Sequence, residues 1–288
     1  MLDSLGSFDL LTPQAVFTAL EGAFGLRLDG TLTTYPSYIN RVYGVRDDEG
    51  IEYVAKFYRP GRWSWETIRQ EHAFVLECAA ADIPVVAPIA DPEGDTLCEV
   101  EVDGSGVDES FPFALYPKRG GRSFDAETDE AWMRLGSVVG RCHAVGRRGE
   151  ASGRPVCTPS TWTRPFVGEL LEANLVHPEI AGEFTDFAED QLETLEPLFA
   201  GVALQRIHGD CHRGNLLDRP GEGLMIIDFD DMMMGPPVQD IWLLLPGHAT
   251  DCGRELTMLL EGYETFADFP WDTLRLIEPL RLMRMIHF

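Results

Sequence analysis

The residues best suited to chemistry lie in one short segment, His208-Gly-Asp-Cys-His-Arg-Gly-Asn215. Asp210 precedes Asn215 by five residues (215 − 210 = 5), in a predicted loop between two strands. Asp228 ends an apolar strand 13 residues later (228 − 215 = 13). Carboxylate and amide oxygens can hold Mg²⁺ together with substrate phosphates, and a further carboxylate can accept a proton from an attacking hydroxyl. The spacing therefore predicts metal-assisted phosphoryl transfer, in which Asp210 and Asp228 are catalytic and Asn215 and Asp228 bind the metal.

This spacing matches the H-R-D-x-x-x-x-N loop of protein kinases and the metal-binding aspartate that follows it. The alternative is a polar turn whose aspartates only cap and bend the chain. A kinase also needs a strand lysine for the nucleotide phosphates, and Val-Ala-Lys56 resembles that strand. Glu71, 71 − 56 = 15 residues later on a predicted helix, is the candidate partner of Lys56, with Glu66 and Glu77 as competing carboxylates.

One part of an ordinary protein kinase is missing. The turn between the first two predicted strands, residues 34–43, contains no glycine, although a glycine-rich phosphate loop is expected there. Contact with phosphate must then come from backbone N–H groups of the turn or from the Ser37 hydroxyl. This departure argues against a eukaryotic-type protein kinase and leaves the predicted catalytic residues in place.

The elements that must position these residues fall into two parts. The first carries helices predicted at 13–24 and 64–81 and strands at 30–35, 41–46, 52–57, 95–102 and 111–116. The second is mainly helical, with helices at 128–147, 163–173, 177–199 and 255–266, strands at 204–208 and 224–228, and an amphipathic segment at 271–288. We predict an α+β, bilobal, protein-kinase-like fold with a nucleotide-binding lobe at 1–117, a hinge at 118–121 and a catalytic lobe at 122–288. The chain stops inside a helical pattern without a cap, so we expect the native protein to continue past Phe288.

Composition excludes several classes of protein. Lys+Arg number 23 against Asp+Glu 48, a net charge of −25, which disfavours nucleic acid as a partner. No apolar run approaches the ~20 residues of a membrane span, and residues 1–6 lack a secretory signal, so we expect a cytoplasmic protein. We further expect it to act as a monomer. The six cysteines form no C-x-x-C pair, which predicts free thiols rather than a zinc site or a disulfide framework.

The motifs together resemble the aminoglycoside phosphotransferase and choline kinase superfamily, which uses H-G-D-x-x-x-x-N and D-x-D. Within it, the chain is similar to the stress response kinase A (YihE/RdoA-type) family of bacterial serine/threonine kinases. The segments that carry this likeness are Ser37-Tyr-Ile-Asn-Arg-Val-Tyr43, Lys56-Phe-Tyr-Arg-Pro-Gly-Arg-Trp63, Glu71-His72, His208-Gly-Asp-Cys-His212, Gly235-Pro-Pro-Val-Gln-Asp-Ile-Trp242 and Ile277-Glu-Pro-Leu-Arg281.

The resemblance implies a role for each matching residue. Asp210 is implied as the catalytic base, and the Mg²⁺ ligands as Asn215 and Asp228. Lys56, paired with Glu71, would hold the phosphates of ATP. The resemblance also implies that Ser37 lies over the nucleotide, that Asp230 lies at the metal site and that Asp240 braces the catalytic loop.

The same resemblance implies ATP-dependent phosphorylation of serine or threonine on protein substrates during a stress response. A small-molecule kinase of the aminoglycoside or choline type is the alternative, since an acidic surface suits a cationic acceptor. A pseudokinase scaffold is the third possibility. The complete set of lysine, glutamate, two aspartates and asparagine argues against it.

Overall fold

The computed structural model describes residues 8–103, 108–219 and 221–287, so part of the predicted turn at 103–110 and the amino-terminal segment lie outside the described residues. The chain divides into two compact units. The N-terminal unit runs to Ala79 and resumes over Val86–Gly120, while the C-terminal unit contains Ala80–Val85 and Gly121–Phe288. No helix within the described ranges is long and apolar enough to cross a membrane.

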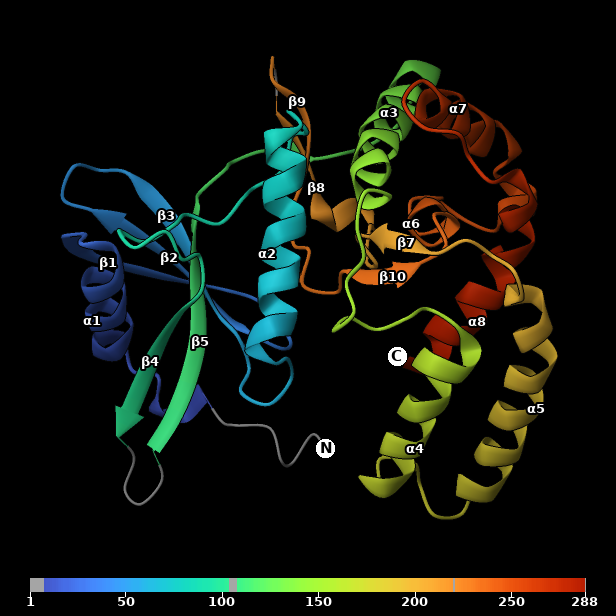
Figure 1. Ribbon diagram of the computed structural model, residues 1–288, viewed down its shortest axis with the longest axis horizontal. Coiled ribbons are helices and arrows are strands. Elements are labelled where there is room, and N and C mark those ends of the chain that lie inside the picture. Colours follow the sequence, from blue (N-terminus) through green and yellow to red (C-terminus); the bar gives the residue numbers. More distant parts are fainter. Residues whose placement is uncertain (1–7, 104–107, 220, 288) are drawn as a thin grey trace. The chain divides into compact units, whose positions relative to one another are not determined.

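The N-terminal unit is built on a five-stranded antiparallel sheet in the order β1-β2-β3-β5-β4 (Figure 1). Its strands are β1 (Leu28–Tyr35), β2 (Arg41–Asp47), β3 (Glu52–Phe57), β4 (Cys98–Asp103) and β5 (Asp108–Pro117), and its helices are α1 (Pro13–Phe24) and α2 (Trp65–Ala80). Both helices start at the predicted caps, because the hydroxyls of Thr12 and Ser64 accept the backbone N–H groups of Ala15 and Thr67.

The two helices pack on opposite faces of this sheet. Phe57 belongs to one hydrophobic cluster with Leu20 of α1, whereas Ala114 belongs to another with Ile68 of α2. The register of β3 and β5 pairs Lys56 with Ala114. Because successive side chains of a strand point to opposite faces, Lys56 lies on the face that α2 covers.

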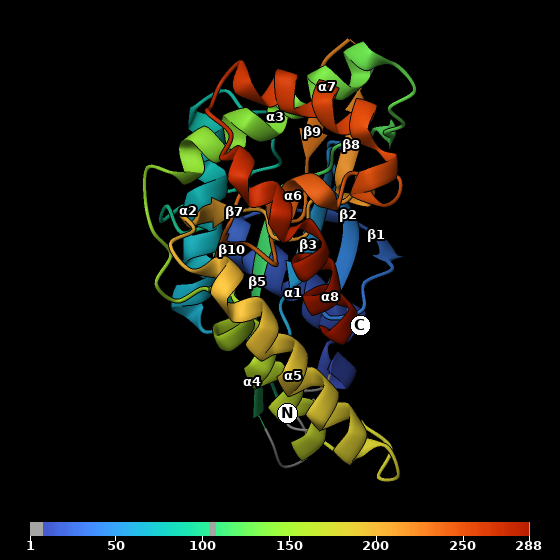
Figure 2. The same cartoon turned by 90° about the vertical axis from the view of Figure 1, so that its right-hand side faces the viewer.

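The C-terminal unit is mainly helical (Figure 2), and its described residues form a two-stranded and a three-stranded sheet. Its helices are α3 (Asp129–Gly146), α4 (Arg164–Glu172), α5 (Ala181–Phe199), α6 (Val238–Trp242), α7 (Gly253–Glu264) and α8 (Ile277–His287). Its strands are β6 (Arg122–Ser123), β7 (Gln205–Ile207), β8 (Leu216–Arg219), β9 (Gly223–Ile226) and β10 (Met233–Gly235), in the orders β10-β7 and β6-β8-β9. The loop at 208–215 joins β7 to β8, and Asp228 follows β9.

These elements confirm the predicted fold class, an antiparallel sheet with helices followed by a mainly helical region. The prediction for helix 13–24 is correct to the residue. The strand predicted at 95–102 starts only at Cys98, because Asp91 Oδ1 accepts the N–H groups of Glu93 and Asp95 and holds 91–95 in a turn. The helix predicted at 177–199 starts at Ala181, after a turn closed by the bond from Ile180 N–H to His177 O.

Two further boundaries differ in the C-terminal unit. The helix predicted at 163–173 is preceded by a turn of π-helix, Pro159–Thr163, and α4 itself spans Arg164–Glu172. The strand predicted at 224–228 ends at Ile226. The next amide, of Ile227, donates to Asn215 O, and Asp228 adopts a left-handed backbone with φ 61°. Asp228 is therefore a loop residue.

Candidate active site

Lys56 and Glu71 form a buried ion pair inside the N-terminal unit. Lys56 Nζ lies 4.0 Å from Glu71 Oε1, and the two side chains are only 10% and 3% exposed. The ammonium also lies over the ring of Tyr58, 4.9 Å from its centre. The two competing carboxylates, of Glu66 and Glu77, are exposed on other sides of α2. The structure thus brings Glu71 to the lysine through the packing of α2 on the sheet.

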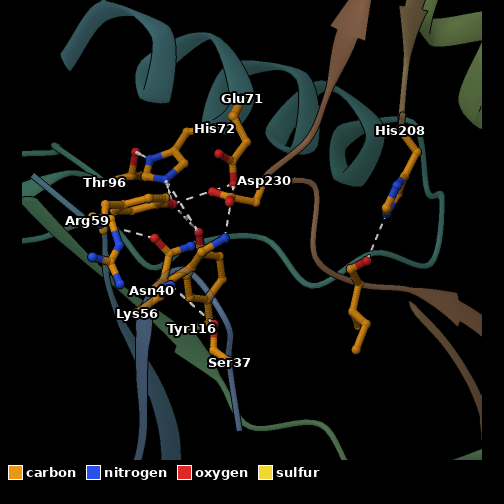
Figure 3. A network of polar contacts seen from close by, with 12 residues as sticks. Ser37, Asn40, Lys56, Arg59, Glu71, His72, Thr96, Tyr116, His208 and Asp230 are labelled. Atoms are coloured by element: carbon orange, nitrogen blue, oxygen red, sulfur yellow. Dashed lines mark hydrogen bonds and ion pairs between the residues drawn. The ribbon is translucent and has the colours of Figure 1, made fainter. Parts of the chain in front are cut away.

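A network of polar side chains surrounds this ion pair. The Tyr58 hydroxyl lies 3.5 Å from Glu71 Oε1, 2.9 Å from His72 Nε2 and 3.0 Å from the Tyr116 hydroxyl. His72 Nδ1 lies 2.8 Å from Thr96 Oγ1, which anchors the imidazole on its other side (Figure 3). Since these groups are buried or half-buried, their hydrogen bonds limit the positions that the Glu71 carboxylate can take.

Ser37 lies in the loop between β1 and β2. Its Oγ accepts the N–H of Asn40 at 3.3 Å, and Asn40 Oδ1 in turn accepts the N–H of Arg59 at 3.1 Å. Arg59 Nε donates to Ile39 O at 2.9 Å, so the loop is held against the residues that follow β3. Side-chain hydrogen bonds therefore shape a turn that in protein kinases depends on glycines.

The loop at 208–215 in the C-terminal unit is held by Asp240 on α6. The Asp240 carboxylate is 1% exposed and accepts the N–H groups of His208 at 2.8 Å and Gly209 at 2.9 Å. His143 Nε2 lies 2.9 Å from the same carboxylate, and its Nδ1 lies 3.1 Å from the Tyr263 hydroxyl. Asp240 thus braces the loop, as the family resemblance implied, and His143 is a buried structural residue.

Gly209 is held from both sides by α6. Gln239 Nε2 donates to Gly209 O at 3.1 Å, while Asp240 accepts its N–H. Gly209 has φ 85°, and a Cβ at this position would overlap the backbone oxygen of Asp231. Only glycine fits this conformation and this close approach without strain.

Backbone and side-chain hydrogen bonds tie Asp210, Asn215 and the segment before Asp228 into one cluster. His208 Nε2 lies 2.9 Å from Ile227 O (Figure 3). His208 Nδ1 accepts the N–H of Asp210 at 3.3 Å. Asn215 Nδ2 donates to Asp210 O, and Ile227 N–H donates to Asn215 O, both at 3.0 Å. The left-handed backbone of Asp228 is rare for a residue other than glycine and typical of functional sites.

The Asp210 carboxylate lies between two basic side chains. Arg284 Nη2 on α8 is 2.8 Å from Oδ1, and His212 Nε2 is 3.3 Å from Oδ2. Burial raises the pKa of Asp210 most strongly, but the hydrogen bond from His212 and the charges of Arg284, His212 and His208 outweigh it and lower the pKa. The hydrogen bond to Asp210 in turn raises the pKa of His212. Asp210 is therefore ionised at neutral pH, as a proton acceptor must be.

The donor set around Asp228 suits Mg²⁺. Among the described residues no group of three or more His, Cys, Asp or Glu side chains is arranged to hold a metal ion. Asn215 and Asp228 supply oxygen ligands only, and Asn215 Nδ2 is engaged by Asp210 O, so Oδ1 is the atom that remains to coordinate. Mg²⁺ is usually held by one or two carboxylates together with substrate phosphates and water. The residues present therefore fit a magnesium ion that arrives with a nucleotide.

The cysteines are free thiols, and most of them are buried. Cys211 lies inside the catalytic loop, and burial raises the pKa of its thiol well above the usual range, which makes it a poor nucleophile. None of the six cysteines forms a disulfide, as the sequence predicted. Five are buried and Cys98 is half-buried.

Each group of predicted site residues is assembled within its own unit. Lys56, Glu71 and Ser37 belong to the N-terminal unit, and Asp210 belongs with Asn215 and Asp228 to the C-terminal unit.

The sequence analysis did not predict two residues that contact the candidate site. Arg284 lies 284 − 210 = 74 residues after the carboxylate that it contacts, and no spacing rule links them. Tyr58 follows the predicted strand, and an apolar–polar pattern does not distinguish it from an ordinary core tyrosine.

The N-terminal sheet carries a buried lysine–glutamate pair, and the helical unit that follows carries an anchored aspartate and candidate oxygen ligands for a metal. This combination defines the class of phosphoryl-transferring enzymes with a kinase-like fold. The phosphotransferase enzyme family matches residues 31–277. Stress response kinase A of Salmonella paratyphi A is 34% identical over 289 residues, covering 100% of this chain and 84% of that protein. Serine/threonine protein kinase RdoA of Salmonella typhimurium shows the same identity and coverage.

The solved structures agree on the fold. Amicoumacin kinase hAmiN, in complex with AMP-PNP and Ca²⁺, matches with a TM-score of 0.77 at 19% identity, over 95% of this chain and 83% of that one. The chain belongs to the phosphotransferase enzyme family and, within it, to the family of stress response kinase A and RdoA. The family membership predicted from the motifs is thereby confirmed.

Proposed function

We propose that this phosphotransferase is an ATP- and Mg²⁺-dependent protein kinase that phosphorylates serine or threonine hydroxyls of protein substrates in a stress response. The observation that carries the proposal is the ionised Asp210 at the centre of a loop anchored by Asp240. The names of its 34%-identical relatives support the choice of a protein acceptor and of a stress response.

In this proposal the acceptor hydroxyl oxygen attacks the γ-phosphorus of ATP in line with the bond to the β–γ bridging oxygen. That bond breaks as the new oxygen–phosphorus bond forms, ADP leaves, and the hydroxyl proton passes to Asp210. Lys56, held by Glu71, would neutralise charge on the phosphates, and Ser37 would contact them from the β1–β2 loop. Asn215 and Asp228 would hold the Mg²⁺, which screens the charge on the transferring group.

The test compares transfer of labelled phosphate from ATP to generic protein substrates and to a panel of small alcohols. We expect transfer to serine or threonine of protein that needs Mg²⁺ and is lost in Asp210→Asn, while that variant still binds nucleotide. Transfer to small alcohols alone would overturn the protein-kinase proposal in favour of a small-molecule kinase. Full activity of Asp210→Asn would overturn the role of base.

A further inference from the structure

Arg284 reaches the proposed catalytic base from a distant part of the C-terminal unit. Its Nη2 lies 2.8 Å from Asp210 Oδ1, and the side chains of Arg284 and Asp210 are 23% and 21% exposed. The contact is thus half-buried, and Asp210 Oδ1 itself is shielded from solvent. An acceptor hydroxyl has to reach the same carboxylate, so it must bind beside the Arg284 guanidinium.

The position of Arg284 is set by the packing of α8. Leu280 and Met283 of this helix are fully buried. One turn beyond Arg284, the His287 ring is stacked between Trp162 and Phe166, with ring centres 4.1 and 4.2 Å apart. Helix α8 is therefore held at both the core and its carboxyl end, so the guanidinium projects from a rigid element.

Supporting the catalytic loop does not require Arg284. The backbone of the loop is already held by Asp240, by Gln239 and by the bond between His208 and Ile227 O. What Arg284 adds is a permanent positive charge at the acceptor side of the base. A guanidinium stays charged at every physiological pH, and its planar group pairs well with carboxylate and phosphate.

The charge that Arg284 contributes has the opposite sign to the net charge of the whole chain. A net charge of −25 favours cationic acceptors at long range. Within contact distance of Asp210, however, Arg284 repels a cationic group beside the acceptor hydroxyl and attracts an anionic one. An aminoglycoside-like acceptor, which carries ammonium groups near its hydroxyls, is therefore a poor fit to this site.

We propose that Arg284 is a specificity-determining residue that binds an anionic side chain, carboxylate or phosphate, placed next to the serine or threonine that is phosphorylated. The inference rests on the proposed function and names its class of substrate: protein segments with acidic or already phosphorylated residues beside the acceptor. Arg284 acts on the binding of the acceptor, and Asp210 remains the group that takes the proton.

The test uses the full chain and one serine peptide in four versions, with glutamate, phosphoserine, glutamine or lysine beside the acceptor. Wild type, Arg284→Gln and Arg284→Lys are compared. Arg254→Gln is the matched control. Arg254 is an exposed residue of α7 that is ion-paired with Asp129, and its substitution removes the same unit of charge.

We expect wild-type kcat/KM to be on the order of tenfold higher for the acidic than for the glutamine peptide, as for other partly exposed charge contacts. Arg284→Gln should reduce that preference to about twofold or less, mainly by raising KM for the acidic peptides, whereas Arg284→Lys retains part of it. Arg254→Gln should keep the full preference. The glutamate and phosphoserine peptides show which anion is preferred.

Three results would overturn the inference. They are a wild-type preference for lysine, equal use of all four peptides, and an unchanged preference in Arg284→Gln. A purely structural role would lower kcat for all peptides alike, and the split between KM and kcat detects it. If thermal melting shows that Arg284→Gln does not fold, the inference is still tested by the preferences of wild type and of Arg284→Lys among the four peptides.

The outcomes separate this inference from the proposed function. Protein phosphorylation without an acidic preference overturns the inference alone. Transfer only to anionic small alcohols, lost in Arg284→Gln, overturns the protein-kinase proposal and supports Arg284 as the anion-binding residue. Transfer only to cationic amino alcohols, or no transfer to any acceptor, overturns both.

Discussion

The bracing of the loop at 208–215 can be tested at Asp240. Its buried carboxylate serves the backbone N–H groups of His208 and Gly209 and the Nε2 of His143, at 2.8, 2.9 and 2.9 Å. Asp240→Asn keeps the shape of the side chain but replaces one oxygen by an NH₂ group, which cannot accept a hydrogen bond. Whichever way the amide turns, at least one backbone N–H then faces another donor.

The expected cost follows from these contacts. A hydrogen bond to a charged group contributes about 1.5–3 kcal/mol, and a buried donor without a partner costs about 1–3 kcal/mol. Asp240→Asn should therefore lower the free energy of unfolding of the C-terminal unit by about 3–5 kcal/mol, a large part of the ~5–15 kcal/mol of an ordinary domain. Tyr263→Phe is the matched control. It removes only the hydroxyl behind His143 and should cost about 1 kcal/mol.

Urea denaturation followed by circular dichroism measures both variants, and hydrogen exchange at the amides of His208 and Gly209 locates the effect. The exchange of these two amides should accelerate in Asp240→Asn and stay near the wild-type rate in Tyr263→Phe. A loss below about 1 kcal/mol in Asp240→Asn, or equal losses in the two variants, would refute the bracing argument.

Three other outcomes are expected. Glu71→Gln removes a negative charge beside the buried Lys56 ammonium and should raise the KM for ATP on the order of tenfold, measured by steady-state kinetics. The same change at the exposed Glu77 should have little effect, and equal effects would contradict the pairing. Asp228→Ala should make ATP binding independent of Mg²⁺, so calorimetric titrations with and without the metal should coincide, and a retained metal effect would count against this ligand. Burial, with the charge of Arg284, lowers the pKa of His287 to about 4 from 6.5. The unfolded chain therefore binds more protons between these pH values, and stability should fall by up to about 3 kcal/mol as the pH drops from 6.5 to 4. Urea midpoints across this range should show the fall in wild type and not in His287→Phe; a flat wild-type profile would argue against the buried, neutral imidazole.

Local sequence was sufficient for the parts of the molecule that depend on neighbours in the chain. The helix at 13–24 is set by its Thr12 cap and its apolar spacing, and both can be found within a dozen residues. In the loop at 208–215, glycine and short polar side chains lie at the offsets that let Asp210 and Asn215 share one turn. The boundaries that were missed, at Cys98 and Ala181, depended on turns whose hydrogen bonds compete with strand and helix.

Tertiary structure decided which of several chemically equivalent groups take part. Glu66, Glu71 and Glu77 carry the same carboxylate, and only the packing of α2 on the face that holds Lys56 selects Glu71. No spacing in the chain brings Arg284 to Asp210, because a contact across 74 residues depends on how α8 packs in the core. Residue types and local offsets thus determined what chemistry this protein can perform. The burial of particular faces determined which charges surround that chemistry, because electrostatic contacts depend on distance in space and on exclusion of water rather than on order along the chain.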